Sequence, residues 1–258
     1  MIKAKKSLGQ NFLKSKAAVQ QILTAADISE GDIILEVGPG KGVLTESLLE
    51  SGAQVIAIEK DDRLIEFLNE KFGEQIEKGQ LKIIHQDILE FNNDDKVGKK
   101  LLEKPYKLVA NIPYYITGAL LRKFLESDNQ PERMVLMLQK EVAKRIVAND
   151  KRESLLSISV KAYGEPKYIA TVPARYFSPV PKVDSAILQI KNISKGFFTE
   201  NKISEEKFFK TLKAGFAHKR KVLIKNLNTT PEIFQKINLS TKIRAENLSL
   251  KEWSLLSL

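Results

Sequence analysis

The sequence predicts an α/β fold in which a mostly parallel sheet carries helices on both faces and a small all-helical domain follows. Short apolar runs typical of strands alternate with helix-like runs from residue 33 to residue 190. Glycines follow the first strand, as in open α/β sheets that bind ligands at their carboxyl edge. Beyond residue 204 only helical patterns remain. We therefore expect one domain over residues 1–191 and a second over 192–258.

The first half of the expected sheet consists of apolar runs separated by amphipathic helices. Strands are expected at 33–37, 54–59, 81–84 and 107–110, and helices at 43–50 and 62–72. The apolar residues from Val43 to Leu49 are spaced to share one helix face. The second helix starts with Asp62, an acid that complements the positive end of the helix dipole. Strands joined through helices are expected to be parallel.

The second half continues this alternation and then closes the sheet. The expected elements are a helix at 117–125, a strand at 134–138, helices at 141–148 and 155–162, and strands at 168–172 and 185–190. No clear period follows over residues 192–201, which include Gly196, so this stretch is the expected linker. Short helices are then expected at 205–216, 220–227, 232–237 and 250–256. Ser249, with Glu252 three residues on, has the spacing of a capping box for the last helix.

Composition excludes several classes of site. With no cysteine, the chain has no disulfides, no thiol metal site and no cysteine nucleophile. His85 and His218 are the two histidines and lie far apart in the sequence, so we expect no metal. No apolar run approaches ~18 residues and no signal core follows the basic N-terminus, so no membrane contact is expected. A cytoplasmic protein is the expectation.

The positive charge is concentrated at the two ends of the chain. Of the net charge of +10, residues 191–258 contribute 14 Lys and Arg against 6 Asp and Glu, which is +8. The first 16 residues contain five lysines and no acid. A polyanion such as RNA or DNA held at these edges is one interpretation, and a solvated lysine-rich surface is the other. The expected RNA contacts are Lys5, Lys6, Lys219, Arg220 and Lys221.

A glycine loop and two carboxylates predict a cofactor site. Residues 36–42 (Glu-Val-Gly-Pro-Gly-Lys-Gly) join the first strand to the first helix, and Gly38 and Gly40 allow close backbone approach. The spacing is G-x-G-x-G, whereas dinucleotide enzymes show G-x-G-x-x-G. Glu59 ends the second strand and suits a ribose, and Asp87 follows the third strand, where it suits an adenine amine. S-adenosylmethionine fits this set; a purely structural turn is the alternative.

Residues 111–114 (Asn-Ile-Pro-Tyr) follow the fourth strand and suggest the chemistry. An exocyclic adenine amine is a poor nucleophile because its lone pair is delocalised into the ring. If Asn111 and a backbone carbonyl each accept one N–H, the nitrogen can pyramidalise towards a methyl sulfonium. Pro113 enforces the extended backbone that turns a carbonyl inward, and Tyr114 offers a stacking surface. In isolation an ordinary Asn-x-Pro turn is the better interpretation; the position beside the cofactor loop reverses that preference.

Several segments closely resemble the ribosomal RNA adenine N6,N6-dimethyltransferases. They are residues 7–13, 36–42, 111–114, 137–142 and 177–185. Segments 216–221 and 244–249 resemble the housekeeping bacterial enzymes more than their macrolide-resistance relatives. The resemblance implies a class I, Rossmann-like methyltransferase sheet and a substrate of two adjacent adenosines in a hairpin loop near the 3′ end of 16S rRNA. Each adenosine would receive two methyl groups within an immature small ribosomal subunit.

The resemblance also implies roles for individual residues. The cofactor contacts would be Asn11, Leu13, Gly38, Glu59, Asp87 and Asn111, with Ile88 as an apolar wall for the cofactor adenine. Tyr114 and Phe177 would sandwich the target base. Residues 153–157 depart from the family, which usually shows an aromatic-glycine pair there. A monomer is the default expectation. A large-subunit enzyme of the macrolide-resistance type, or an assembly factor that acts mainly by binding, are the alternatives.

Two further residues are expected to be structural. Trp253 lies on an apolar helix and is expected in the core of the C-terminal domain. Asp184 lies in a proline-rich loop, where a carboxylate more often fixes backbone amides than takes part in catalysis.

Overall fold

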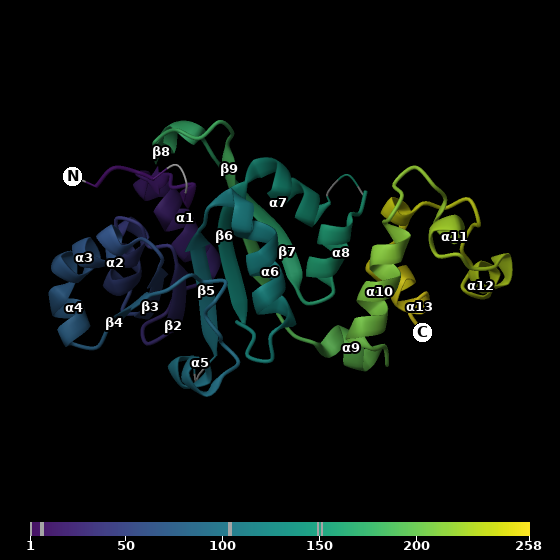
Figure 1. The fold of residues 1–258 in the computed structure, drawn as a ribbon, viewed down its shortest axis with the longest axis horizontal. Helices are drawn as coiled ribbons and strands as arrows, with labels where there is room; N and C mark the ends of the chain where they lie inside the picture. The colour runs from purple at the N-terminus through teal and green to yellow at the C-terminus, as the bar shows by residue number, and fades with distance from the viewer. Residues whose placement is uncertain (1, 6–7, 103–104, 149, 151) are drawn as a thin grey trace. The chain divides into compact units, whose positions relative to one another are not determined.

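A computed structural model describes residues 2–5, 8–102, 105–148, 150 and 152–258 (Figure 1). They form two compact units, each of which combines two stretches of chain. The first unit comprises Met1–Ala143 and Lys167–Ile193, and the second Lys144–Pro166 and Ser194–Leu258.

The first unit contains a seven-stranded sheet in the order β4-β3-β2-β5-β6-β9-β7. The strands are β2 (Ile33–Val37), β3 (Gln54–Glu59), β4 (Leu81–His85), β5 (Tyr106–Asn111), β6 (Arg133–Gln139), β7 (Glu165–Val172) and β9 (Ser185–Lys191). The pairs from β4 to β6 are parallel, and β9 runs antiparallel to β6. Chain order reverses between β2 and β5, because β3 and β4 extend the sheet on one side and β5 and β6 on the other. Ligands of open α/β sheets bind at such a switch point.

Helices cover both faces of this sheet (Figure 1). The helices along this part of the chain are α1 (Lys16–Ala26), α2 (Val43–Glu50), α3 (Asp62–Lys71), α4 (Gly73–Glu77), α5 (Lys96–Leu101), α6 (Thr117–Glu126) and α7 (Lys140–Val147), of which α5 lies beyond the strand ends (Figure 1) and α7 extends from the first unit into the second. Successive residues of a strand face opposite sides of a sheet. Ile34 packs in one core with Ile22 of α1 and Leu48 of α2. Ile34 and the adjacent Leu35 are both fully buried, so the strand is covered on both sides.

The chain before α1 forms a separate, short pairing. β1 (Phe12–Leu13) runs antiparallel to β8 (Phe177–Ser178), with Leu13 opposite Phe177. This pairing holds the N-terminal segment beside the carboxyl ends of the parallel strands. Two short 3-10 turns, Tyr114–Ile116 and Ala174–Tyr176, lie in the same region of the first unit.

The second unit is helical apart from the first two residues of β7. Its helices are α8 (Leu155–Lys161), α9 (Gly196–Glu200), α10 (Glu205–Gly215), α11 (Leu223–Asn226), α12 (Pro231–Lys236) and α13 (Leu250–Leu255). Trp253 is fully buried and stacks on Phe216, as predicted for a core residue. Ser249 and Glu252 form the predicted capping box. Gly215 is needed because a Cβ there would lie 2.3 Å from the Trp253 ring.

The structure differs from the sequence expectations in a few places. Helices α1, α4 and α5 were not predicted, and the expected linker contains α9. The expected helix at 220–227 is reduced to Leu223–Asn226 because a turn occupies residues 218–221. The expected domain boundary after residue 191 lies close to the structural one after Ile193, but Lys144–Pro166 groups with the second unit. Tyr163 accounts for this grouping, since its ring contacts Phe198 and stacks on Phe209.

We expect Gly215→Ala to destabilise the second unit by about 2 kcal/mol, the usual cost of overpacking a tight core. Urea unfolding followed by the fluorescence of Trp253, the only tryptophan, measures the change. Gly118→Ala in α6 is the matched control, because nothing lies within 4 Å of an added Cβ there. Equal unfolding midpoints for the two variants would contradict the prediction.

Candidate active site

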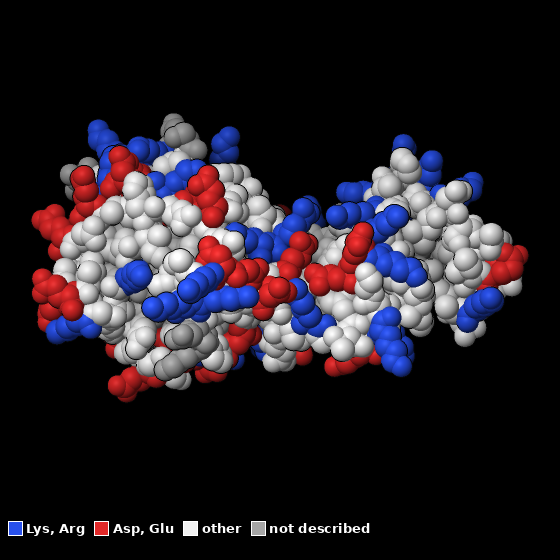
Figure 2. All heavy atoms as spheres, turned by 60° about the horizontal axis from the view of Figure 1, so that its bottom comes forward, with Lys and Arg blue, Asp and Glu red and all other residues white. Residues whose placement is uncertain are grey.

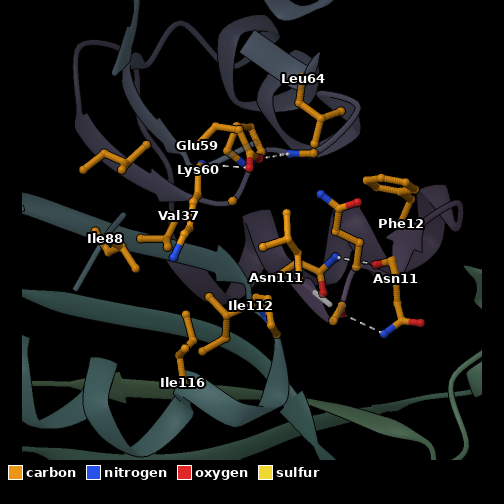
Figure 3. Close-up of a pocket in the computed structure, with 18 of the residues that line it drawn as sticks. Asn11, Phe12, Val37, Glu59, Lys60, Leu64, Ile88, Asn111, Ile112 and Ile116 are labelled. Carbon is orange, nitrogen blue, oxygen red and sulfur yellow. Dashed lines mark hydrogen bonds between the residues drawn. The ribbon is translucent and has the colours of Figure 1, made fainter. Parts of the chain in front are cut away.

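A pocket lies at the carboxyl edge of the sheet in the first unit (Figure 3). Its walls come from the ends of β2, β3 and β5, the turn after β4, the segment around β1, and β8. All the predicted cofactor and catalytic residues line it: Asn11, Leu13, Gly38, Gly40, Glu59, Asp87, Ile88, Asn111, Pro113, Tyr114 and Phe177. Residues more than 160 positions apart in the sequence therefore meet in one cavity. Their individual roles stay predictions.

The glycine loop after β2 lines the pocket. Gly38 and Gly40 adopt positive φ angles of 67° and 59°, a conformation that glycine reaches without strain. A Cβ on Gly40 would lie 3.1 Å from the ring of Phe12, so the bare backbone also allows the N-terminal segment to approach. The loop therefore leaves backbone open to a ligand on one side and packs against Phe12 on the other.

Glu59 ends β3 and is almost completely buried. Its Oε1 accepts the N–H groups of Lys60 and Asp61, each at 2.9 Å, and its Oε2 accepts that of Gly40 at 3.2 Å. Burial raises the pKa of Glu59, although these three hydrogen bonds oppose the shift. A carboxylate has about four acceptor positions, so Glu59 keeps capacity for a further donor such as a ribose hydroxyl.

Asp87 lies two residues beyond β4, with Ile88 forming a buried apolar surface beside it. Its Oδ2 is 2.6 Å from Lys60 Nζ, and its Oδ1 accepts the N–H of Leu89 at 2.9 Å. Burial acts to raise the pKa of Asp87, but the bonds from Lys60 and Leu89 outweigh it and hold the pKa below its usual value. Asp87 is therefore a charged acceptor at the pocket edge.

Glu36 is a pocket residue that the sequence analysis did not single out. Its side chain is 1% exposed, and its Oε2 has no hydrogen-bond partner among the described residues. Burial raises its pKa to about 8, and the neighbouring Glu59 carboxylate adds to the shift. The sequence signal for it was an acid two residues before Gly38, at the start of the glycine loop. Gln10, Phe12 and Lys60 also line the pocket without having been predicted.

Asn111 ends β5 and points into the pocket (Figure 3). Its Nδ2 donates to the backbone oxygen of Asn11 at 3.4 Å, and no hydrogen bond between described residues uses its Oδ1. Pro113 has the expected extended backbone, and its carbonyl is used by the N–H of Ile116. No hydrogen bond between described residues uses the Ile112 carbonyl. Asn111 and Ile112 thus offer two acceptors at one place.

The aromatic residues of the pocket differ in exposure. Tyr114 is about half buried, and its hydroxyl is 2.8 Å from Ser185 Oγ. Burial raises the pKa of Tyr114, against the effect of that hydrogen bond. Phe177 is 1% exposed, and its backbone pairs with Leu13. Both rings lie in the pocket wall, and their sandwiching of a base stays a prediction.

The predicted basic contacts occupy different environments. Lys5 Nζ lies 3.3 Å from Asp61 Oδ1 and 3.5 Å from Asp62 Oδ1, so it is paired within the protein. Lys6 lies outside the described residues. Lys219, Arg220 and Lys221 are exposed in the turn between α10 and α11. On the face shown in Figure 2, basic and acidic side chains are interspersed.

Other predictions concern residues outside the pocket. Asp184 Oδ1 accepts the N–H of Ala174 at 3.0 Å, which confirms that this carboxylate fixes a backbone amide. Within the described part of the chain, no group of three or more His, Cys, Asp or Glu could hold a metal ion. None of the helices in that part is both long enough and apolar enough to cross a bilayer.

Comparison with known proteins identifies relatives over the full chain. The family model described as ribosomal RNA adenine dimethylase matches residues 1–256. A Dehalococcoides mccartyi protein named ribosomal RNA small subunit methyltransferase A is 46% identical, over 100% of this chain and 88% of its own. A Fusobacterium nucleatum protein of the same name is 37% identical, over 97% and 95% of the two chains.

Two solved structures share the fold over nearly the whole chain. A dimethyladenosine transferase from Plasmodium falciparum matches with a TM-score of 0.79 and 26% identity, covering 95% of this chain and 96% of its own. The 23S rRNA methyltransferase ErmE matches with a TM-score of 0.76 and 24% identity, covering 96% and 98%. At that identity, the second match shows the fold alone.

The raised pKa of Glu36 predicts that the free energy of unfolding of the ligand-free protein depends on pH. Its folded pKa of about 8 lies above the ordinary value of 4.5, so between these values the folded state holds a proton that the unfolded state has lost. Glu36 therefore lowers the free energy of unfolding as pH rises from about 4.5 to 8, by an amount on the order of 4 kcal/mol. Urea unfolding at pH 5 and pH 8 should show this loss in the wild type and a smaller one in Glu36→Gln.

Glu66→Gln, a substitution of an exposed acid on α3, is the control and should follow the wild-type pH dependence. If the wild type and Glu36→Gln lose the same stability between the two pH values, Glu36 does not titrate in this range and the prediction is wrong.

Proposed function

The chain belongs to the ribosomal RNA adenine dimethylase family, and on that basis we propose that it dimethylates the N6 amines of two adjacent adenosines in a hairpin loop near the 3′ end of 16S rRNA. S-adenosylmethionine is the methyl donor, and the reaction belongs to small-subunit biogenesis. The observation that carries the proposal is the meeting of Asn111 with Glu59 and Asp87 in one pocket. These residues match a base amine, a ribose and a cofactor adenine.

The pocket residues fit S-adenosylmethionine chemically. Glu59 would accept the ribose hydroxyls, and Asp87 would accept the adenine amine while Ile88 packs against the ring. The backbone around Gly38, Asn11 and Leu13 would surround the remaining part of the cofactor. The unpartnered Oε2 of Glu36 adds an acceptor that a cationic ligand would satisfy, because the positive charge of the ligand would favour the ionised form of this carboxyl. When bound, the cofactor supplies an electrophilic methyl group on a sulfonium.

Asn111 and Ile112 prepare the adenine for methyl transfer. In the first transfer, Asn111 Oδ1 and the Ile112 carbonyl each accept one N6 hydrogen, which draws the nitrogen lone pair out of the ring. In the second transfer, the one remaining N6 hydrogen is accepted by one of these two oxygens. When bound, S-adenosylmethionine would supply the methyl group that N6 accepts, with the carbon–sulfur electron pair leaving on sulfur, and N6 would then lose one proton. The amine is strongly acidic once alkylated, so no general base with a shifted pKa is required. Tyr114 stacks on the base after it leaves its RNA stack, which costs least in a loop.

The family assignment also indicates the binding partners, which are RNA and the small ribosomal subunit. Lys219, Arg220 and Lys221 contact RNA phosphates, and the enzyme acts as a cytoplasmic monomer on an immature small subunit. The relatives at 37–46% identity are named for the small subunit, which disfavours the macrolide-resistance alternative. A pocket with a full set of cofactor and base residues argues against a role limited to binding.

Asn111→Ala is expected to reduce methylation at least 100-fold while changing the Kd for S-adenosylhomocysteine only a few-fold. Removing the acceptor affects the transition state more than cofactor binding, because the other cofactor contacts remain. Methylation is measured by primer extension on both rRNAs from cells in which this chain replaces the resident enzyme. Cofactor binding is measured by calorimetry on the purified protein.

The matched control is Asn69→Ala, at an exposed position of α3 outside the pocket. It should methylate at the wild-type rate. Full methylation by Asn111→Ala would refute the mechanism, and methylation of the large-subunit rRNA by the wild type would refute the substrate assignment.

Changing Lys219, Arg220 and Lys221 together to Gln is expected to weaken RNA binding and reduce its salt dependence. Each lost phosphate contact lowers the slope of log K against log salt by ~0.7 to 0.9, so three contacts lower it by about 2. Filter binding of a helix-loop RNA at several salt concentrations measures the slope. Lys236→Gln, at another exposed position of the second unit, should leave it nearly unchanged. An unaltered slope in the triple variant would place the RNA elsewhere.

A further inference from the structure

The N-terminal arm, defined as residues 2–5 and 8–13, forms one wall of the cofactor pocket. Residues 8–13 all line the pocket, and Asn11 contacts Asn111 through its backbone oxygen. The only regular pairing of the arm, within its described residues, is the two-residue contact of β1 with β8. Besides this pairing and the Asn11–Asn111 contact, side-chain hydrogen bonds identify a further attachment of the arm.

That attachment is Asp61, the N-cap residue of α3. Its side chain is fully buried, and both oxygens are used. Gln10 Nε2 donates to Oδ2 at 2.8 Å, and Lys5 Nζ lies 3.3 Å from Oδ1. Gln10 Oε1 in turn accepts the backbone N–H of Lys5 at 2.8 Å, so the two arm residues are joined to each other as well as to Asp61.

Arg63 completes the network on the side of α3. Its guanidinium contacts both Asp61 oxygens, at 3.0 and 2.6 Å, and also donates to the backbone oxygen of Lys3 at 3.3 Å. The hydrogen bond from Arg63 holds the pKa of Asp61 well below its usual range despite burial. Asp61 is therefore a charged, buried acceptor, and such a group is costly to leave without partners.

Asp61 is also hydrogen-bonded to Glu59, the carboxylate proposed to bind the cofactor ribose. The backbone N–H of Asp61 donates to Glu59 Oε1 at 2.9 Å, and Lys60 between them pairs with Asp87. Asp61 itself does not line the pocket. Any influence on the cofactor must therefore pass through the arm on one side and Glu59 on the other.

We propose that Asp61 is a positioning residue that locks the N-terminal arm against Glu59 and so determines how tightly the enzyme retains its cofactor. Lys5 serves as an anchor of the arm in this network, in place of the RNA contact expected from the sequence. The proposal rests on the cofactor site described under the proposed function. It requires that loosening the arm weakens cofactor binding although no cofactor contact is altered.

Two variants test the arm and the carboxylate separately in the full-length protein. Asp61→Asn keeps the shape of the side chain but removes its charge. The arm variant, Lys5→Met, removes the ion pair from the arm's side and changes no residue that lines the pocket. We expect the Kd for S-adenosylhomocysteine to rise about tenfold in each, as for the loss of one hydrogen bond to a charged group. Calorimetry without RNA measures this Kd. The KM for S-adenosylmethionine should rise in parallel, with kcat changed less than about threefold.

Amide hydrogen exchange measures directly how firmly the arm is held, which a Kd for the cofactor does not. Exchange over residues 8–13 should accelerate in both variants, whereas exchange in β3 should stay at the wild-type rate. Glu66→Gln makes the same acid-to-amide change on an exposed face of α3 and should alter neither the Kd nor the exchange.

Unchanged Kd and unchanged arm exchange in folded Asp61→Asn would overturn the proposal. A higher Kd in Asp61→Asn together with a wild-type Kd in the arm variant would also overturn it, since the effect would then bypass the arm. If Asp61→Asn fails to fold, the arm variant alone decides, because it leaves Asp61 bonded to Arg63. A wild-type protein that does not bind S-adenosylhomocysteine would instead refute the proposed cofactor.

Discussion

The parallel pairing of β2 with β3 on one side and β5 on the other is the constraint on which the site depends. It places the carboxyl ends of the central strands at one edge of the sheet. Gly38, Glu59 and Asn111 come from three different strand ends and would not meet in any antiparallel arrangement of the same strands. The helices, by burying Ile34 on one face and Leu35 on the other, keep this sheet in register.

Three carboxyl groups at that edge have different protonation behaviour because their surroundings differ. Glu36 is buried without a partner for Oε2, Glu59 is buried but accepts three backbone N–H groups, and Asp87 is paired with Lys60. The pKa is therefore raised for Glu36 and Glu59 and lowered for Asp87. One pocket can in this way offer a neutral acid and a charged acceptor to different parts of one ligand.

The sequence predicted those elements whose structure depends on neighbouring residues, such as the buried strands and the glycine loop. Strands buried on both faces are short apolar runs, so β2, β3 and β6 were located within a residue or so. The glycine loop was recognisable because Gly38 and Gly40 have a backbone role. The Asp61 network was not predictable, because Lys5 and Gln10 lie 56 and 51 positions from Asp61. Lys5 was predicted to contact RNA from its charge alone, because its pairing with Asp61 and Asp62 is not visible in the sequence.

The arm is attached by contacts that form at different stages of synthesis. Lys5 and Gln10 meet Asp61 across a short stretch of chain, whereas Phe12 pairs with Ser178, 166 positions later. Closing so long a loop costs more entropy and waits for the intervening strands. A nascent chain can therefore dock its first residues early on Asp61 but completes the pocket only after β8 has emerged. The cofactor site is consequently one of the last parts of the first unit to acquire its native form.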